Sequence, residues 1–431
     1  MVTQTIAQIA AELEGYDPQS LPASGVLAFL QQLVTPVTEQ VELGLFDALG
    51  KVLAADVISP LDVPPHDNSA MDGYAFDGSA LDATTPLRLT VVGTAMAGKA
   101  WVGKAGAGDC VKIMTGAVMP ASYDTVVPQE LVSVDGDASI CIPAGALRQG
   151  DNRRLRGEDI CEGFPALRKG QRLTPARLGL AASLGLQTLP CWRPLRVAYF
   201  STGNEILTLG EPPREGAVFD SNRYTVFGLL NGLGCEVIDL GVIKDEPDLL
   251  EAAFRRASTQ ADAIITSGGV SVGEADHTKA MMKKIGDVAF WRIAMRPGRP
   301  MAVGRMAAQQ NSEAGAVLFG LPGNPVAVMV TFLAFVRPAL LQMMGCEDIA
   351  TPLLKAHSQE VLRKKAGRTE YQRGWVSSAP DGSLQVRTTG NQGSGVLSSM
   401  AEANGLIVLH HSQGNVAMGE LVDVMMFEGV T

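Results

Sequence analysis

The chain has 431 residues, of which 46% are hydrophobic and 19% are charged, and this composition excludes an intrinsically disordered protein. Lys and Arg number 35 against 45 Asp and Glu, so the net charge of −10 argues against wholesale binding of nucleic acid. Any anionic ligand therefore needs a local basic site, and at this length we expect about three domains.

The remaining global features bear on where the protein is located. The six cysteines occur singly, without a CxxC pair or a zinc-type cluster, which predicts reduced thiols. The N-terminus carries acidic residues and lacks the basic and apolar regions of a secretory signal. The longest apolar stretch, 326–336, is too short to span a membrane. We expect a cytoplasmic protein that binds neither a membrane nor nucleic acid.

The first half of the chain predicts two domains, one inserted into the other. Residues 20–60 begin with apolar residues at helical spacing, and a second helix is expected around FDALGKVLAADV. Residues 71–149 change to short alternating runs between glycine turns, which predicts a small β domain. Thr174 and Pro175 then start another helix, which could rejoin the early ones. We therefore predict a helical and extended N-terminal domain, 1–70 and 150–187, that carries the inserted β domain.

The second half predicts two further domains. Residues 188–346 alternate strand and helix, which is typical of a doubly wound α/β domain with parallel strands. Residues 347–431 return to β texture with glycine loops, which predicts a terminal β barrel, with a sandwich as the alternative. The expected fold class is thus multidomain α/β plus β.

Four polar loops follow predicted strands of the α/β domain and should open on one edge of its sheet. They are STGNE (201–205), KDEP (244–247), TSGGVSVGEAD (266–276) and GLPGNP (320–325). The glycines would let backbone amides approach a phosphate at a helix N-terminus. The loop acids would repel a bare phosphate, but Mg²⁺ takes one or two carboxylates together with phosphate oxygens. The four loops together predict a site for a magnesium-bound phosphoanhydride, although each loop taken alone could be a turn or a helix cap.

Two arginine clusters could bind oxyanions, because a guanidinium group matches tetrahedral oxyanions with paired donors. They are RRLRGED, which contains Arg153, Arg154 and Arg156, and RIAMRPGRP, which contains Arg292, Arg296 and Arg299. A salt-bridged surface is the alternative for either cluster. The segment HDNSAMDG could be a hinge or a second acidic site built on Asp67 and Asp72. No GxSxG, HExxH or GxxxxGK[ST] motif occurs where it would matter, so serine nucleophile chemistry is not indicated.

A set of motifs resembles one known family. DNSAMDGYA, GEDI, STGNE, TSGGVSVGEADHTK, RPGRP and GLPGNPVAV occur in an order similar to that of the bacterial molybdopterin molybdenumtransferases, called MoeA, which are related to the C-terminal part of gephyrin. The resemblance runs from about residue 20 to the end of the chain. TSGGVSVGEAD alone would also fit the molybdopterin adenylyltransferases, but the flanking domains and DNSAMDG favour the molybdenumtransferases. A gephyrin-like scaffold without catalytic activity is the other alternative.

The resemblance implies an elongated four-domain homodimer that inserts molybdenum from molybdate into adenylylated molybdopterin and releases AMP with a divalent cation, expected to be Mg²⁺. It also implies that a molybdopterin adenylyltransferase and molybdoenzyme apoproteins or their chaperones are partners. The family's functional acids fall on Asp67, Asp159, Glu205, Asp245 and Asp276. Of these, Glu205, Asp245 and Asp276 are the expected metal ligands.

The loops and the resemblance together give the expected binding residues. They are Thr202, Gly203, Ser267, Gly268, Gly269, Gly273, Pro322, Gly323, Asn324, Pro325, Arg296, Arg299, Arg368, Arg373 and Ser394. The chain departs from the family at KPGKP, where both lysines are arginine, so the charge is kept while the donor geometry changes. The tyrosine often found after the EAD motif is His277, to which we assign no catalytic role.

Overall fold

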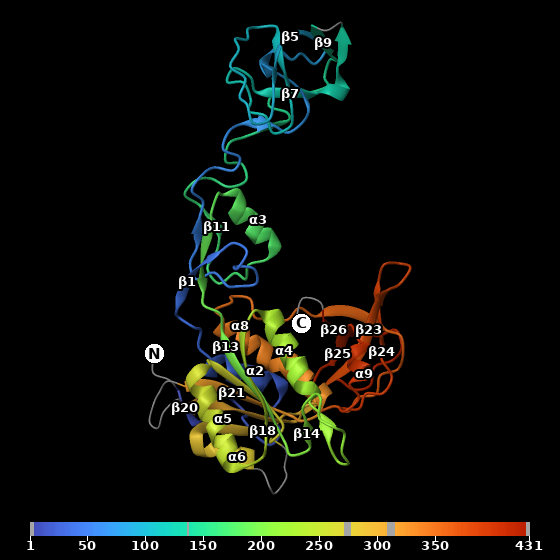
Figure 1. Ribbon diagram of the computed structural model, residues 1–431. Helices are drawn as coiled ribbons and strands as arrows, with labels where there is room; N and C mark the ends of the chain where they lie inside the picture. Colours follow the sequence, from blue (N-terminus) through green and yellow to red (C-terminus); the bar gives the residue numbers. More distant parts are fainter. Residues whose placement is uncertain (1–3, 136–137, 271–276, 308–314, 428–431) are drawn as a thin grey trace.

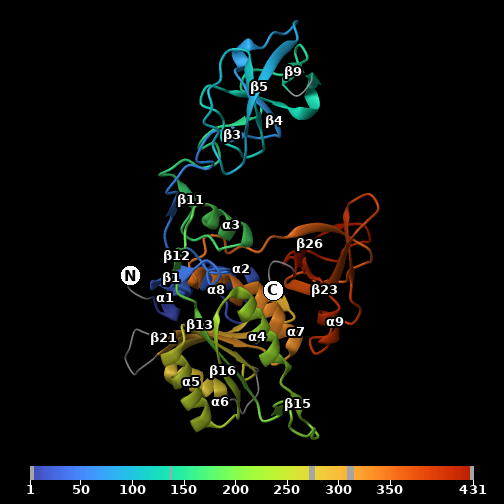
Figure 2. The same ribbon diagram turned by 45° about the horizontal axis from the view of Figure 1, so that its top comes forward.

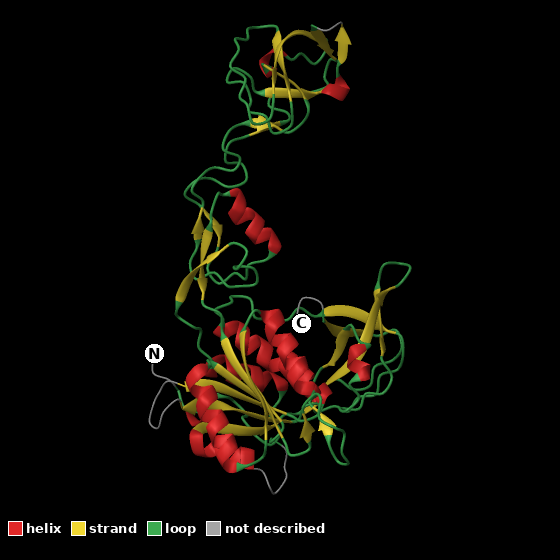
Figure 3. Ribbon diagram, viewed as in Figure 1, coloured by secondary structure: helices red, strands yellow, loops and turns green. Residues whose placement is uncertain are grey.

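The computed structural model describes residues 4–135, 138–270, 277–307 and 315–427. These residues form an elongated molecule (Figure 1, Figure 2). An α/β domain and a C-terminal β domain lie side by side at one end, and a small β domain lies at the other. A slender linker domain of short strands and one helix connects the two ends (Figure 3).

The α/β domain is built on a six-stranded sheet of order β16-β13-β17-β21-β20-β18. The strands are β13 (Arg196–Thr202), β16 (Glu236–Ile243), β17 (Ala263–Ser267), β18 (Gly286–Arg292), β20 (Pro300–Ala307) and β21 (Gly315–Leu321). The first four strands in this order are parallel, whereas β20 runs antiparallel to both of its neighbours. The helices are α4 (Ser221–Leu233), α5 (Pro247–Gln260), α6 (His277–Ile285), α7 (Pro325–Thr331) and α8 (Arg337–Met343).

Helices cover both faces of this sheet, which confirms the predicted doubly wound domain. Successive residues of a strand point to opposite faces, so Ile264 belongs to one buried cluster and Ile265 to the other. Phe254 of α5 and Met282 of α6 pack on the face of Ile264. Helices α4, α7 and α8 pack on the face of Ile265. The parallel strands therefore all deliver their carboxyl ends to one edge of the domain.

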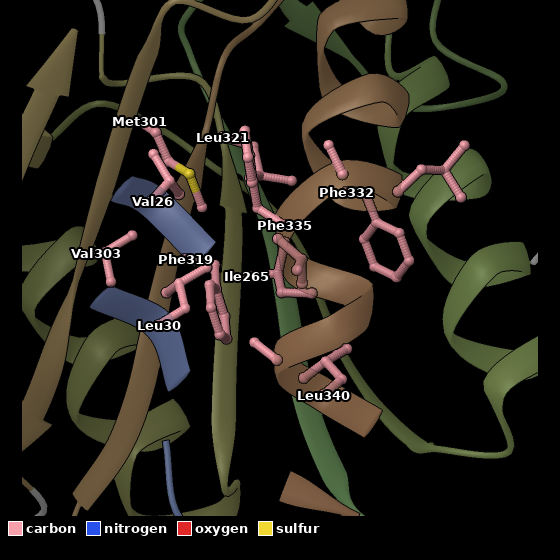
Figure 4. Packing of buried hydrophobic residues seen from close by; sticks show 14 of the residues in the cluster. Val26, Leu30, Ile265, Met301, Val303, Phe319, Leu321, Phe332, Phe335 and Leu340 are labelled. Atoms are coloured by element: carbon pink, nitrogen blue, oxygen red, sulfur yellow. The ribbon is translucent and has the colours of Figure 1, made fainter. Parts of the chain in front are cut away.

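Two N-terminal helices, α1 (Ile6–Glu12) and α2 (Ala23–Leu33), also pack on the α/β sheet. Figure 4 shows Val26 and Leu30 of α2 beside Val303 and Phe319 of the sheet. Residues 6–34 therefore lie with the α/β domain, whereas the sequence pattern predicts residues 1–70 as part of the N-terminal domain. The sequence pattern predicts that α2 has an apolar face, but it does not predict the domain against which this face is buried.

The helix expected at FDALGKVLAADV does not form, and this prediction is wrong. Residues 46–57 turn at Gly50, whose φ is 75°, and continue in extended form. Val52 bridges Arg172, and Leu53 bridges Cys191. Burial of Leu53 in the core of the linker domain thus outweighs the helical pattern of the segment.

The linker domain consists of two passes of the chain, one leading to the inserted β domain and one returning from it. Its elements are β1 (Gln40–Gly44) paired with β12 (Thr188–Trp192), β2 (Val57–Ile58) paired with β11 (Pro165–Leu167), and α3 (Pro175–Ser183). The Thr174 hydroxyl accepts a hydrogen bond from the Arg177 amide, so the predicted N-cap of α3 is confirmed. A junction of β3 (Asn68–Ser69) with β10 (Arg153–Arg154) leads into the inserted domain.

The inserted domain is a six-stranded β structure of order β7-β4-β6-β5-β9-β8. Its elements are β4 (Gly73–Phe76), β5 (Leu87–Ala95), β6 (Asp109–Ile113), β7 (Thr125–Pro128), β8 (Ser133–Asp135), β9 (Ser139–Ile142) and the short 3₁₀ turns η1 (Gly78–Ala80) and η2 (Gln129–Leu131). Two buried clusters, one containing Val111 and one containing Ile140, give it a core of its own.

The C-terminal domain is a closed five-stranded barrel, which confirms the predicted barrel over the sandwich. Its elements are β22 (Leu354–Ser358), β23 (Thr369–Ser378), β24 (Leu384–Thr388), β25 (Gly405–Leu409), β26 (Leu421–Met426) and the short helix α9 (Ser398–Ala401). Pairing of β23 with β25 closes the barrel. Strand β19 (Met295–Arg296) leaves the α/β domain and pairs with β23, which ties the two domains together.

The apolar stretch after Pro325 is longer than expected, because α7 continues through a π-helical turn, η3 (Phe332–Val336), into α8. Pro338 has no amide hydrogen to donate, which favours a wider turn before it. The helix Pro325–Met343 is long and apolar enough to cross a membrane by length and composition, which corrects the expected length. Its apolar window is 83% buried inside the molecule, so core packing accounts for its composition (Figure 4).

Candidate functional site

A cavity of about 940 Å³ opens beyond the carboxyl ends of β13, β17 and β21, between the α/β domain and the barrel. Three of the four predicted loops contribute to its wall, and so do RPGRP and a loop of the barrel. The predicted residues that line it are Thr202, Glu205, Ser267, Gly268, Gly269, Arg296, Arg299, Pro322, Gly323, Asn324, Pro325, Arg368 and Ser394. We call this cavity the pocket.

The glycine turn after β17 requires glycine at two successive positions. Gly268 has φ 90° and Gly269 has φ 66°, in the left-handed region that side chains disfavour. A Cβ at Gly268 would lie 2.4 Å from the Thr202 carbonyl oxygen, and one at Gly269 would lie 2.5 Å from the Thr278 Cβ. The backbone is therefore packed closely beneath the pocket and presents no side chain there. Gly273 lies outside the described residues.

A buried hydroxyl network supports this turn from below. The Tyr199 hydroxyl lies 2.7 Å from the Ser267 Oγ and 2.9 Å from the Ser201 Oγ. Burial raises the pKa of Tyr199 far above its ordinary value, so its hydroxyl stays protonated. The network fixes Ser267, which lines the pocket, to the strand beside it.

Two of the predicted metal ligands lie near the glycine turn. The Asp245 carboxylate accepts a hydrogen bond from the Thr278 hydroxyl at 3.2 Å, and the Thr278 side chain packs beside Gly269. Asp245 itself does not line the pocket. The Glu205 carboxylate does, and it lies where a Cβ on Gly203 would come within 2.6 Å of it, so Gly203 makes room for this acid. Asp276 lies outside the described residues.

These acids fit a hard cation that is completed by a ligand. Among the described residues no three His, Cys, Asp or Glu side chains gather as a metal cluster. Glu205 has no side-chain partner in the described part of the chain, and Asp245 keeps one carboxylate oxygen free there. Mg²⁺ commonly takes one or two protein carboxylates and fills its other positions with water and phosphate oxygens. Such a donor set suits Mg²⁺ better than a metal that needs a closed protein cage.

Arg296 and Arg299 provide the positive charge of the pocket. Both side chains are exposed and line it, and neither forms an ion pair or a side-chain hydrogen bond with another described residue. Gly298 lies between them with φ 97°, so the turn holds both arginines on the pocket side of β20. Guanidinium groups without protein partners are available to an oxyanion.

Arg368 and Arg373, unlike Arg296 and Arg299, already interact with other groups of the protein. Arg368 lines the pocket but is paired with Glu370, whose carboxylate lies 2.6 Å from its Nη2. Arg373 is buried and donates to the carbonyls of Asn391, Gln392 and Gly393 and to Ser399. Burial and the nearby charge of Arg296 lower its pKa to about 10. Arg373 therefore holds the 391–393 loop rather than reaching the pocket.

The loop that Arg373 holds joins the barrel to the GLPGNP turn. The Ser394 hydroxyl accepts a hydrogen bond from Asn324 Nδ2 at 3.0 Å, and the Val326 amide donates to the Ser394 carbonyl at 3.2 Å. Pro325 starts α7, as its position at the first helical residue predicts. The barrel thus closes one side of the pocket through Ser394.

Asp67 and Asp159 are not brought to the pocket within one chain. Both lie at the junction between the linker domain and the inserted domain, and the linker domain separates this junction from the α/β domain in both views (Figure 1, Figure 2). Asp67 accepts hydrogen bonds from the Arg156 amide and from Arg153, and these bonds lower its pKa. Asp159 is exposed and has no side-chain partner among the described residues.

Asp72, the other acid of HDNSAMDG, is occupied in the same way as Asp67. Its carboxylate accepts from the Thr115 amide and hydroxyl, both at 2.7 Å, and these bonds lower its pKa. Asp67 and Asp72 are thus bound to different segments, and they form no shared acidic cluster in the described residues.

A group of residues at the start of α4 also lines the pocket, although the sequence pattern does not predict a site there. Asp220 and Asn222 line the pocket, and the strand β15 (Val218–Phe219), which pairs with β14 (Ile206–Leu207), leads into them. Asp220 also caps α4 by accepting a hydrogen bond from the Arg223 amide. An aspartate directly before a predicted helix is usually interpreted as a helix cap. The position of Asp220 in the pocket wall follows from the pairing of β15 with β14, which the sequence pattern does not predict.

Three family models match the chain in succession. They are the MoeA N-terminal region (domains I and II) at residues 21–185, a probable molybdopterin binding domain at residues 198–342, and the MoeA C-terminal region (domain IV) at residues 355–427. A molybdopterin molybdenumtransferase of Haemophilus influenzae is 41% identical over 399 residues, which cover 92% of this chain and 96% of that protein. The chain belongs to the MoeA family.

Further relatives of this MoeA family member agree. Gephyrin of Dictyostelium discoideum is 30% identical over 345 residues, which cover 74% of this chain and 48% of gephyrin. The crystal structure of a molybdopterin biosynthesis MoeA protein from Pyrococcus horikoshii matches with a TM-score of 0.78 at 26% identity, over 95% of this chain and all of that one. A molybdopterin adenylyltransferase would need only the molybdopterin binding domain. The two MoeA regions that flank this domain, at residues 21–185 and 355–427, therefore argue against that alternative.

Proposed function

We propose that this MoeA protein is a molybdopterin molybdenumtransferase that inserts molybdenum from molybdate into adenylylated molybdopterin and releases AMP with Mg²⁺. The observation that carries the proposal is the pocket itself. It places a side-chain-free glycine turn, Glu205, and the unpaired Arg296 and Arg299 on one cavity between the α/β domain and the barrel. Family membership supports the same function.

The phosphoanhydride of the substrate would lie over the glycine turn. Close backbone approach at Gly268 and Gly269 suits a phosphate group. Asp245 and Glu205, with Asp276 outside the described residues, would hold Mg²⁺, which neutralises charge on a reacting phosphoanhydride. The acids keep this end of the pocket negative, so a nucleotide phosphate without a cation is repelled there. Hydrolysis of the anhydride, in which water supplies the attacking oxygen, would release AMP with its own phosphate and leave the other phosphate on the molybdopterin product.

Molybdate would lie at the arginine side of the pocket. Arg296 and Arg299 have no protein partners in the described residues, and Ser394 adds a hydroxyl from the barrel loop. Arg368 already balances its charge with Glu370 and is therefore the weaker donor of the barrel. The molybdate dianion needs this positive charge because the opposite wall carries carboxylates.

We further propose a homodimer in which the partner's junction reaches this pocket. Asp159 has no partner in its own chain among the described residues. The linker domain carries Phe46, which is fully exposed, and Phe164, which is 65% exposed, and exposed apolar groups of this kind favour a protein interface. Mixing an Asp159→Ala protein with an Asp276→Ala protein tests the arrangement, and partial recovery of activity is expected if the residues act across subunits. No recovery after verified subunit exchange would contradict it.

We also propose a cellular location and protein partners. A cytoplasmic location fits the reduced, unpaired cysteines. The adenylyltransferase that makes the substrate and the molybdoenzyme apoproteins or chaperones that accept the product are the proposed partners.

The function is tested by incubating the purified chain with adenylylated molybdopterin, molybdate and Mg²⁺ and measuring AMP. Release that depends on molybdate and Mg²⁺ is expected. An adenylyltransferase would instead consume ATP and unmodified molybdopterin, and a scaffold would do neither. Failure to release AMP under these conditions would contradict the proposal.

A further inference from the structure

The base of the pocket holds buried oxygen atoms that lack hydrogen-bond partners in the described residues. They are the Thr202 Oγ1, the Asp220 Oδ2 and the Asn222 Oδ1. The three residues are 3%, 5% and 7% exposed, and all three line the pocket. A buried acceptor without a partner is unfavourable, so such groups in a pocket wall indicate a ligand that donates to them.

The hydrogen bonds of Asp220 and Asn222 fix which atoms stay free. The Asp220 Oδ1 accepts from the Arg223 amide at 3.1 Å, which leaves Oδ2. The Asn222 Nδ2 donates to the Gly323 carbonyl at 2.8 Å, so the amide oxygen is the atom without a partner. Two acceptors therefore stand two residues apart at the start of α4, beside the GLPGNP turn.

Two free acceptors in one pocket wall do not suit the other parts of the proposed substrate. A phosphate group or molybdate would be repelled by the Asp220 carboxylate. Adenine presents its amino group next to a ring nitrogen that accepts. The pyrimidinone ring of a pterin presents a 2-amino group next to a ring N–H, so both of its neighbouring groups donate. Ile206 and Phe219 also line the pocket and offer apolar contacts to a flat ring.

We propose that Asp220 and Asn222 recognise the donor edge of the pterin and thereby fix the orientation of the substrate in the pocket. This inference rests on the proposed function, because it takes the pterin as part of the substrate. Under this assignment Asp220 determines specificity. Its Oδ2 can accept a hydrogen bond from a ligand donor such as the pterin 2-amino group, and it repels a ligand acceptor in the same place.

The test compares two free heterocycles that differ at one position. The full chain is titrated with 6-hydroxymethylpterin and with 6-hydroxymethyllumazine, in which a carbonyl oxygen replaces the 2-amino group. Wild type should bind the pterin about tenfold more tightly than the lumazine. Asp220→Asn keeps a helix cap and replaces the free oxygen with an NH₂ group, so it should abolish this preference. Asp220→Ser also keeps a cap while removing the second oxygen, and the same loss is expected.

Asp239→Asn is the matched control, because Asp239 pairs with Arg223 of the same helix and does not line the pocket. It should keep the wild-type preference, and binding of AMP with Mg²⁺ should be unchanged in every variant. Equal preference in wild type and Asp220→Asn would overturn the assignment, as would a parallel loss of pterin and AMP. If wild type still releases AMP in that case, the proposed function stands; if wild type neither binds the pterin nor releases AMP, both fail.

Discussion

The pocket and the junction between the linker and inserted domains both collect charged side chains, but they use them differently. In the pocket, Arg296 and Arg299 have no side-chain partner among the described residues. At the junction, Asp67 is held by Arg153 and by the Arg156 amide. Charged groups without protein partners can form all of their hydrogen bonds and ion pairs with a ligand, whereas paired groups already form them within the fold. The comparison separates residues that bind from residues that hold the chain, and the family motifs alone do not make this distinction.

The largest effect is expected at Asp245. Asp245→Asn removes a carboxylate charge beside the glycine turn and should lower AMP release by about a hundredfold or more, with the fold intact. Asp276→Asn should act in the same way. The measurement is the rate of AMP release at increasing Mg²⁺. Asp239→Asn, which changes an acid away from the pocket, is the control, and near-normal turnover of Asp245→Asn at saturating Mg²⁺ would remove Asp245 from the metal site.

Gly268→Ala should abolish most phosphate binding through the backbone. The added Cβ would meet the Thr202 carbonyl oxygen at 2.4 Å, and the φ of 90° adds a strain of about 1–2 kcal/mol. Gly108→Ala is the matched control, because Gly108 has φ 85° and nothing within 4 Å of its Cβ position. Both variants should lose stability in thermal unfolding, but only Gly268→Ala should lose affinity for AMP with Mg²⁺. Equal AMP affinity in the two variants would show that the turn does not contact the phosphate.

The sequence predicted the elements of the pocket better than it predicted their partners. Paired glycines and strand-end loops mark the α/β edge because parallel strands end on the same side. The state of Arg373 could not be predicted in this way, since the carbonyls that it binds belong to the 391–393 loop. The same limit applies to residues 46–57, whose helical pattern gives way to contacts with a strand more than a hundred residues away. Local pattern predicts the element type of most segments, whereas long-range contacts decide where that pattern is overridden, which face is buried and which charge remains free.

Replacing Arg296 or Arg299 by Ala should weaken molybdate binding about tenfold or more, because each removes charge-assisted hydrogen bonds of about 1.5–3 kcal/mol. Affinity for AMP with Mg²⁺ should change much less. Separate calorimetric titrations of the two ligands provide the measurement. Arg373→Ala is the contrasting variant: it should mainly lower the unfolding temperature by releasing the 391–393 loop. Equal losses for both ligands in the Arg296 and Arg299 variants would move these arginines to the phosphate.

The smallest effect is expected at the junction, where Asp67 serves the fold of its own chain. Hydrogen bonds from the Arg156 amide and from Arg153 hold the pKa of Asp67 below its ordinary value of 3.8, and partial burial opposes them. A depressed pKa in the folded state stabilises the protein above the ordinary pKa, and this contribution is lost as the pH falls through the folded-state pKa. Asp67→Asn should therefore cost less than about 1 kcal/mol at neutral pH, because the pair is partly exposed.

Thermal unfolding of wild type and Asp67→Asn across pH checks this expectation. The difference in unfolding temperature should be constant near neutral pH and should shrink as the pH falls through and below 3.8. Asp159→Asn should leave the unfolding temperature unchanged, because Asp159 has no side-chain partner in the described residues. Asp159→Asn is also tested for AMP release in the assembled dimer. If it lowers AMP release while Asp67→Asn mainly lowers stability, then Asp67 stabilises the junction and Asp159 takes part in the reaction. Equal effects of the two variants on stability would show that the contacts of Asp67 contribute nothing to the fold, and the contrast with the pocket would then fail.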